Sequence, residues 1–269
     1  MSAFIAGGRS VELLRTGTGE PLLYLHGLAD VHANWAPAEP TELVRALAAQ
    51  RDVIAPALPG YQGSDALDAG ADVEDHAFHL VDVLDALELD AVDVMGCSFG
   101  GWIGAELALR QPARVRRLVL VDPLGLHVRG EPGALFFGAA APRGVGGFGE
   151  VRSVLFADPD SPIALSALPD DPDHDHMLRW FTGLTGAAQV GWTAPQLCNP
   201  KLGARLGRIA APTLLLWGEQ DQIAPLAHGE RWRDGLSDAR LEKVAGAGHC
   251  AHLEQPADVA RLALEFLSS

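Results

Sequence analysis

The sequence is poor in cysteine and has no long apolar run. Its three cysteines, Cys97, Cys198 and Cys250, are far apart, so we expect neither a disulfide framework nor a Cys-x-x-Cys metal site. No apolar stretch approaches the roughly 18 residues that a membrane helix needs. The first residues lack the basic and apolar regions of a secretory signal. These absences predict a cytoplasmic protein that does not span a membrane.

Basic residues are also scarce. The chain carries 20 Lys and Arg residues against 35 Asp and Glu residues, which gives a net charge of -15, and its basic residues form no run. Nucleic acids and anionic membranes bind cationic surfaces, so we expect neither of them as a partner. The expected partner is a small-molecule substrate, and no feature of the sequence indicates an oligomeric state.

The chain of 269 residues is 48% apolar, which is typical of a globular protein. Short runs rich in Val, Ile and Leu alternate with longer amphipathic stretches. This alternation predicts an α/β fold with a mostly parallel sheet and helices on both faces. Strands are expected at 3–6, 9–15, 22–25, 53–58, 92–95, 118–121, 213–217 and 240–244. Helices are expected at 72–89, 99–111, 226–236 and 256–267.

The alternation breaks between residues 124 and 205. The stretch is Gly-rich around 144–149 and rich in Pro and Asp around 158–173. A plain loop of this length is rare inside a compact domain, so we expect an inserted module. The prediction is one core domain, residues 1–123 and 206–269, with an insertion at 124–205.

A nucleophile motif lies where a predicted strand meets a predicted helix. The segment Gly96–Gly100 matches the pattern Gly-x-Ser-x-Gly. A strand that turns directly into a helix leaves no room for side chains two residues either side of the serine, which explains the glycines. The motif predicts that Ser98 is a nucleophile. The alternative interpretation is a Gly- and Ser-rich turn that only packs the helix on the sheet.

A serine hydroxyl needs a base to remove its proton, and the base needs a carboxylate to orient it. The favoured base is His249, on a glycine-rich turn after the last predicted strand, with His252 as its competitor. The favoured acid is Asp221, which follows the preceding strand. Glu219 on the same loop and Asp122 at the end of strand 118–121 are the alternatives. Serine, acid and histidine then follow the chain order that this motif predicts.

Two backbone N–H groups should stabilise the oxyanion that forms when the serine attacks. One is the N–H of Phe99, at the start of the predicted helix. The other is the N–H of Leu28, after strand 22–25, where Gly27 allows a close approach. We expect His26 to anchor this loop rather than to ionise in catalysis.

These motifs together resemble the α/β-hydrolase superfamily. The matching segments are His26-Gly27, 58–65, 96–100, 217–221, and Gly248-His249 with 254–256. The resemblance implies an eight-stranded, mostly parallel sheet and a helical cap, or lid, at 124–205. Two departures are visible: Ala57 stands where many relatives carry Asp, and the Gly-x-Ser that follows in relatives is Gln62-Gly63-Ser64 here. Ser98 argues against the dehalogenases and epoxide hydrolases, which carry Asp as the nucleophile.

The expected activity is cleavage of an ester, lactone or thioester of a small, moderately hydrophobic substrate through an acyl-enzyme. No cofactor is needed. No metal is expected either, and the cluster 170–176 is interpreted as a solvated acidic loop. Aromatic residues expected to line the substrate site are Trp35, Trp102, Phe136, Phe137, Trp180 and Trp192.

Three alternatives stay open. The same triad can hydrolyse a carbon–carbon bond next to a carbonyl. It can also act as a cofactor-free haloperoxidase or perhydrolase. Because a fold does not fix a function, the chain could also be a non-catalytic small-molecule receptor.

Overall fold

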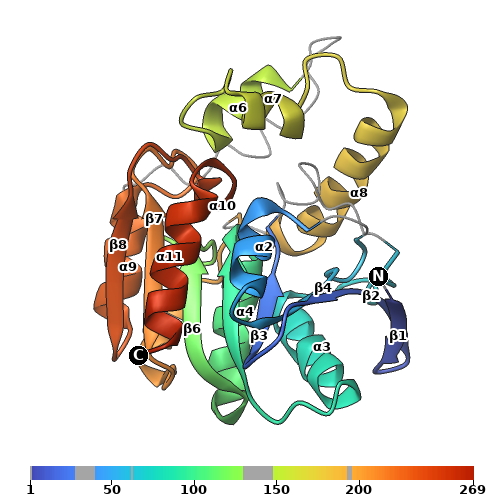
Figure 1. Cartoon of the computed structure of the whole chain (residues 1–269), viewed down its shortest axis with the longest axis vertical. Coiled ribbons are helices and arrows are strands. Elements are labelled where there is room, and N and C mark those ends of the chain that lie inside the picture. Colours follow the sequence, from blue (N-terminus) through green and yellow to red (C-terminus); the bar gives the residue numbers. More distant parts are fainter. Residues whose placement is uncertain (1, 28–39, 62, 130–147, 193–195) are drawn as a thin grey trace.

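The computed structural model describes residues 2–27, 40–61, 63–129, 148–192 and 196–269 (Figure 1). Eight strands form one sheet in the order β1-β2-β4-β3-β5-β6-β7-β8. The strands are β1 (Ser2–Ala6), β2 (Arg9–Thr16), β3 (Pro21–Leu25), β4 (Asp52–Pro56), β5 (Val92–Cys97), β6 (Val115–Val121), β7 (Thr213–Gly218) and β8 (Ala239–Val244). The first two strands are antiparallel to their neighbours, and the other six run parallel. The expected fold is confirmed.

The sequence of each strand fits its place in the sheet. All six residues of β5 and all six of β7 are buried, as expected for central parallel strands that are covered on both faces. The β1–β2 hairpin turns at Gly7 and Gly8, which have φ angles of 55° and 81°. Two consecutive positive φ angles are what a tight hairpin turn requires.

Helices flank both faces of the sheet (Figure 1). They are α2 (Glu42–Ala48), α3 (Val73–Ala86), α4 (Ser98–Arg110), α9 (Leu226–Gly235), α10 (Ala251–Glu254) and α11 (Pro256–Leu267). Helix α3 begins at a capping box: Asp72 accepts from the backbone N–H groups of Glu74 and Asp75, and Asp75 accepts from that of Asp72. Helix α3 packs on α4, and α11 packs on α2.

Among the described residues, three α-helices lie between β6 and β7 in the chain: α6 (Gly149–Leu155), α7 (Pro162–Ala167) and α8 (His174–Gly191). They lie beyond one end of the strands (Figure 1). Two hydrogen bonds identify which end this is. The Cys250 N–H, in the loop after β8, donates to Leu155 O, and the Tyr61 hydroxyl, in the loop after β4, donates to Gly183 O. These helices, called here the α6–α8 segment, therefore lie over the carboxyl ends of the parallel strands.

Arg152 joins α6 to the loops on either side of α7. Its buried guanidinium donates to Pro159 O, to Leu168 O and to the Asp170 carboxylate. A guanidinium in a buried position is stabilised when its donors find acceptors, as they do here. No helix among the described residues is long and apolar enough to cross a membrane.

Candidate active site

The turn from β5 into α4 presents the side chain of Ser98. Ser98 has a φ angle of 52°, a left-handed conformation that is rare for residues other than glycine. A Cβ atom on Gly96 would lie 2.5 Å from Gly100 O, and one on Gly100 would lie 2.3 Å from Leu25 O. Both positions therefore require glycine, and the strained turn aims the Ser98 hydroxyl at the edge of the sheet.

A chain of two hydrogen bonds joins the three residues expected to form a triad. Ser98 Oγ lies 2.7 Å from His249 Nε2, and His249 Nδ1 lies 2.8 Å from Asp221 Oδ2. All three side chains are buried. A carboxylate next to Nδ1 keeps the proton on that nitrogen, so Nε2 is left to accept the serine proton.

The loop after β7 fixes the acid. Asp221 Oδ1 accepts hydrogen bonds from the N–H groups of Ile223 at 2.7 Å and Ala224 at 2.9 Å. These bonds leave Oδ2 to face His249. Glu219, on the same loop, is exposed. Of the two carboxylates that follow β7, Asp221 is the one that reaches the histidine.

The other two alternatives also have defined positions. Asp122 is buried at the end of β6, and its Oδ1 accepts from the Gly218 N–H at 2.8 Å. Burial, together with the charge of Asp221, raises the pKa of Asp122 well above its usual value. His252 is buried on α10, and the imidazole bonded to Ser98 is that of His249.

The loop after β3 lies against the nucleophile turn. A Cβ atom on Gly27 would lie 3.1 Å from Ser98 Cβ, so a glycine permits this approach. His26 joins two loops, since its Nε2 accepts from the Leu58 N–H at 3.0 Å and its Nδ1 lies 3.0 Å from Gly27 O. The predicted donor Leu28 lies outside the described residues. Phe99, the other predicted donor, is in the first turn of α4.

The predicted pocket aromatics fall into three groups. Trp35, Phe136 and Phe137 lie outside the described residues. Trp102 and Trp180 are buried: Trp102 contacts the Phe99 ring edge-on, and Trp180 packs on Phe148 with ring centroids 5.0 Å apart. Trp192 is 57% exposed. Their role in substrate binding stays a prediction.

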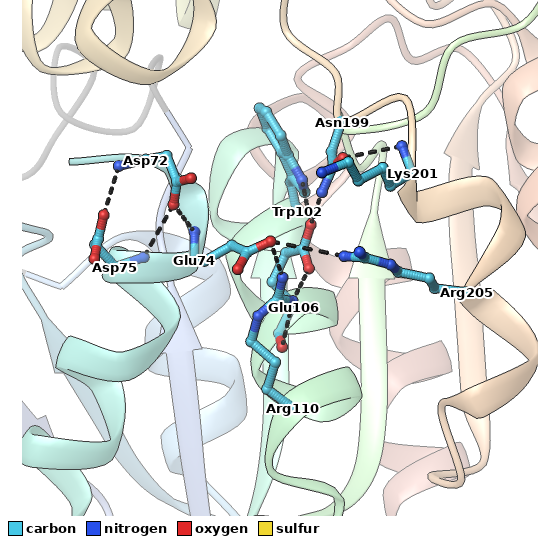
Figure 2. Close-up of polar contacts among 9 residues, drawn as sticks. All are labelled: Asp72, Glu74, Asp75, Trp102, Glu106, Arg110, Asn199, Lys201 and Arg205. Carbon is cyan, nitrogen blue, oxygen red and sulfur yellow. Dashed lines mark hydrogen bonds and ion pairs between the residues drawn. The ribbon is translucent and has the colours of Figure 1, made fainter. Parts of the chain in front are cut away.

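Sequence reasoning missed an ionic network that surrounds the buried Glu106, beside Trp102 (Figure 2). Glu106, fully buried on α4, accepts from Trp102 Nε1 at 3.3 Å and Asn199 Nδ2 at 2.9 Å, and it pairs with Arg110. Glu74 of α3 pairs with Arg110 and Arg205. The chain leaving the α6–α8 segment is therefore bonded to the helix that begins at Ser98. The sequence does contain a signal for this network. Glu106 lies four residues from both Trp102 and Arg110 on an otherwise apolar helix.

A second missed residue is Glu254 of α10. Its Oε1 accepts from the Ala157 N–H at 2.9 Å and its Oε2 from the Gly248 N–H at 2.7 Å. One carboxylate thus joins the α6–α8 segment to the residue before His249. Burial raises the pKa of Glu254, against the opposing effect of these hydrogen bonds. In the sequence, residues 254–256 supported the family resemblance, but they indicated no role for Glu254.

Within the described residues, no group of three His, Cys, Asp or Glu side chains is arranged to hold a metal ion. From the acidic cluster 170–176, Asp170 pairs with Arg152. The chemistry that the described site supports is proton transfer from Ser98 to His249.

Known proteins resemble the chain over nearly its whole length. The model of the alpha/beta hydrolase family matches residues 22–262. The chain is 31% identical to 2-hydroxymuconate semialdehyde hydrolase of Pseudomonas sp. strain CF600, over 98% of this chain and 92% of that protein. It is 33% identical to polyketide synthase ThaQ of Burkholderia thailandensis, of which it spans only 12%, while 93% of this chain is covered.

A solved structure shares the fold. The meta-cleavage product hydrolase CumD of Pseudomonas fluorescens IP01 superposes with a TM-score of 0.79 at 22% identity, over all of this chain and 97% of that one. With the sheet, the motifs and the family model in agreement, the chain belongs to the alpha/beta hydrolase family. The expectation of a hydrolase enzyme is thereby confirmed.

Proposed function

We propose that the chain is a serine hydrolase in which Ser98 attacks a carbonyl carbon, His249 is the general base and acid, and Asp221 orients the histidine. The hydrogen-bonded chain from Ser98 through His249 to Asp221 carries this proposal. The strained turn at Ser98 adds support, because strain of this kind is found where a nucleophile must be presented.

The proposed cycle has two halves. His249 takes the Ser98 proton as the oxygen adds to the carbonyl, and it then protonates the leaving group, which leaves an acyl-enzyme. Water attacks the acyl-enzyme by the same route. The N–H groups of Phe99 and Leu28 are the proposed oxyanion donors. One such donor is worth about 3 kcal/mol of barrier in well-studied enzymes.

The favoured substrate is a small, moderately hydrophobic ester, lactone or thioester. The proposed cap, residues 124–205, contains the α6–α8 segment, and its buried aromatic pair of Phe148 and Trp180 offers an apolar wall. The bonds from this segment to the His249 loop support a cap that closes over the site.

Hydrolysis of short p-nitrophenyl esters tests the proposal. We expect turnover by the wild type and a loss of about four orders of magnitude or more in kcat for Ser98→Ala, because the nucleophile is removed. The matched control is Ser153→Ala, which changes an exposed serine of α6 and should leave the rate unchanged. Equal rates for wild type and Ser98→Ala would overturn the role of Ser98.

Carbon–carbon bond hydrolysis is the second candidate. The relative named 2-hydroxymuconate semialdehyde hydrolase supports it, because a compound of that name contains no ester and its hydrolysis must break a carbon–carbon bond. Parallel assays on 2-hydroxymuconate semialdehyde and on p-nitrophenyl acetate separate the candidates. A kcat/KM at least tenfold higher for the semialdehyde would favour the second candidate, and the reverse ratio the first.

A further inference from the structure

A buried carboxyl group lies behind the acid of the proposed triad. Asp122 directly follows β6, and its side chain is fully buried. Oδ1 accepts from the Gly218 N–H, but no donor among the described residues reaches Oδ2. A buried carboxylate oxygen without a donor is costly, so the state of Oδ2 requires a physical explanation.

The explanation lies in the neighbouring carboxyl group. Asp122 and Asp221 meet at one turn, since the Gly218 N–H donates to Asp122 Oδ1 and the Gly218 oxygen accepts from the Asp221 N–H at 3.2 Å. Two ionised carboxylates buried side by side repel each other strongly, so such a pair retains one proton. A proton on Asp122 Oδ2 turns that atom into a donor to Asp221 and satisfies both groups.

The number of donors decides which residue carries the proton. Asp221 accepts three hydrogen bonds, from the N–H groups of Ile223 and Ala224 and from His249 Nδ1. Asp122 accepts one, from Gly218. Hydrogen bonds to the ionised form favour ionisation, so the negative charge belongs on Asp221 and the proton on Asp122.

The surrounding charges act in the same direction. Within the described part of the chain, the charged groups that act on Asp122 are Asp221 and Glu254, and both are acidic, while His249 faces Asp221 from the other side. Burial, followed by the charge of Asp221, raises the pKa of Asp122 well above its usual value.

We propose that Asp122 is protonated at neutral pH and donates its O–H to Asp221, which positions that carboxylate against His249. The proposal rests on the proposed function of the triad. It makes Asp122 a positioning residue, because Asp122 acts through Asp221 and not on the substrate. Of the pair Asp122 and Asp221, only Asp221 then carries a negative charge behind the histidine.

Two substitutions separate the proton from the rest of the side chain. Asp122 has a φ angle of 45°, which Asn and Gly both tolerate. Asp122→Asn keeps an oxygen for the Gly218 N–H and presents an N–H to Asp221, without a charge. Asp122→Gly keeps the backbone conformation and removes both groups.

The first test is the pH profile of kcat/KM for both variants on an ester that the wild type hydrolyses. Asp122→Asn should stay within about threefold of the wild type with an unmoved acid limb, because one neutral group replaces another. Asp122→Gly should lose about tenfold in kcat with KM unchanged, because Asp221 loses its support. A shift of the acid limb in Asp122→Asn to lower pH by about one unit would reveal an ionised Asp122 and overturn the proposal. Full kcat in Asp122→Gly would also overturn it.

The second test needs no turnover. In a Ser98→Ala background, an infrared difference spectrum between Asp122 and Asp122→Asn protein at neutral pH should show the C=O stretch of a protonated carboxylic acid. Absence of that band would overturn the proposal. If the band is present in a protein that hydrolyses no substrate, the proposed function fails and the protonation of Asp122 stands.

Discussion

The edge of the sheet that carries Ser98, Asp221 and His249 is the proposed catalytic edge, and it is built differently from the α6–α8 segment above it. At this edge, two backbone N–H groups hold the Asp221 carboxylate, and the positive φ angle of Ser98 fixes the direction of its side chain. The α6–α8 segment leaves large apolar side chains exposed on α8, such as Leu178 and Phe181. We infer that the edge determines the chemistry and the segment determines which substrate arrives.

The largest effect expected at the catalytic edge comes from the acid. Asp221→Asn should lower kcat by about 10⁴-fold, because Asn favours the wrong tautomer of His249. Glu219→Gln, on the same loop but exposed, is the matched control and should be neutral. Steady-state kinetics at neutral pH check both variants. A small effect of Asp221→Asn with a large effect of Asp122→Asn would transfer the role of acid to Asp122.

Weakening the Glu254 contacts that join the two regions should have an intermediate effect on kcat. Glu254→Gln places an N–H₂ group against one of two backbone donors, Ala157 or Gly248, and so loosens the loop of His249. We expect kcat to fall by about tenfold, as is typical when a group that orients a catalytic residue is changed. Glu265→Gln, an exposed change on α11, is the control. An unchanged kcat would show that the two regions are independent.

Changes within the α6–α8 segment should alter preference more than rate. Trp180→Phe removes part of the apolar wall and should change the ratio of kcat/KM for long and short p-nitrophenyl esters by about tenfold. Trp232→Phe, which changes a buried Trp of α9, is the control and should leave the ratio unchanged. An equal fall in kcat for every ester would contradict the inference that the α6–α8 segment determines which substrate arrives.

The smallest effect concerns stability. A folded-state pKa above the unfolded value means that the folded protein keeps a proton which the unfolded chain has lost, so stability falls as pH rises above the usual pKa of Asp. Asp122→Asn does not titrate. Its free energy of unfolding relative to wild type should therefore increase by about 1.4 kcal/mol per pH unit above about pH 4, until Asp122 ionises in the folded state. Urea unfolding at several pH values measures this difference, and a constant difference would contradict it.

The core elements could be predicted because local sequence determines them. Strand β7 and helix α3 lie within two or three residues of the predicted 213–217 and 72–89. Helices α6 and α7 could not be predicted. Helix α6 begins inside a Gly-rich stretch, and α7 has six residues in a region rich in Pro and Asp. Arg152 stabilises them through tertiary contacts that no local pattern encodes.

The candidate site likewise contains residues that could be predicted from the sequence and contacts that could not. Ser98, Asp221 and His249 could be singled out because each follows a strand whose carboxyl end faces the site. Their catalytic roles remain a proposal. The bonds of Asp122 with Gly218 and of Glu254 with Ala157 could not be predicted, because they join residues that are 96 and 97 positions apart in the chain.

The most direct test of the central claim is to find where a fluorophosphonate probe reacts. Intact-protein and peptide mass spectrometry after labelling should show one adduct, on Ser98, in the wild type and none in Ser98→Ala. The label should be greatly slowed in Asp221→Asn, because the hydroxyl then lacks an oriented base. A wild type that does not react, or an adduct on any other residue, would contradict the assignment of Ser98 as the nucleophile.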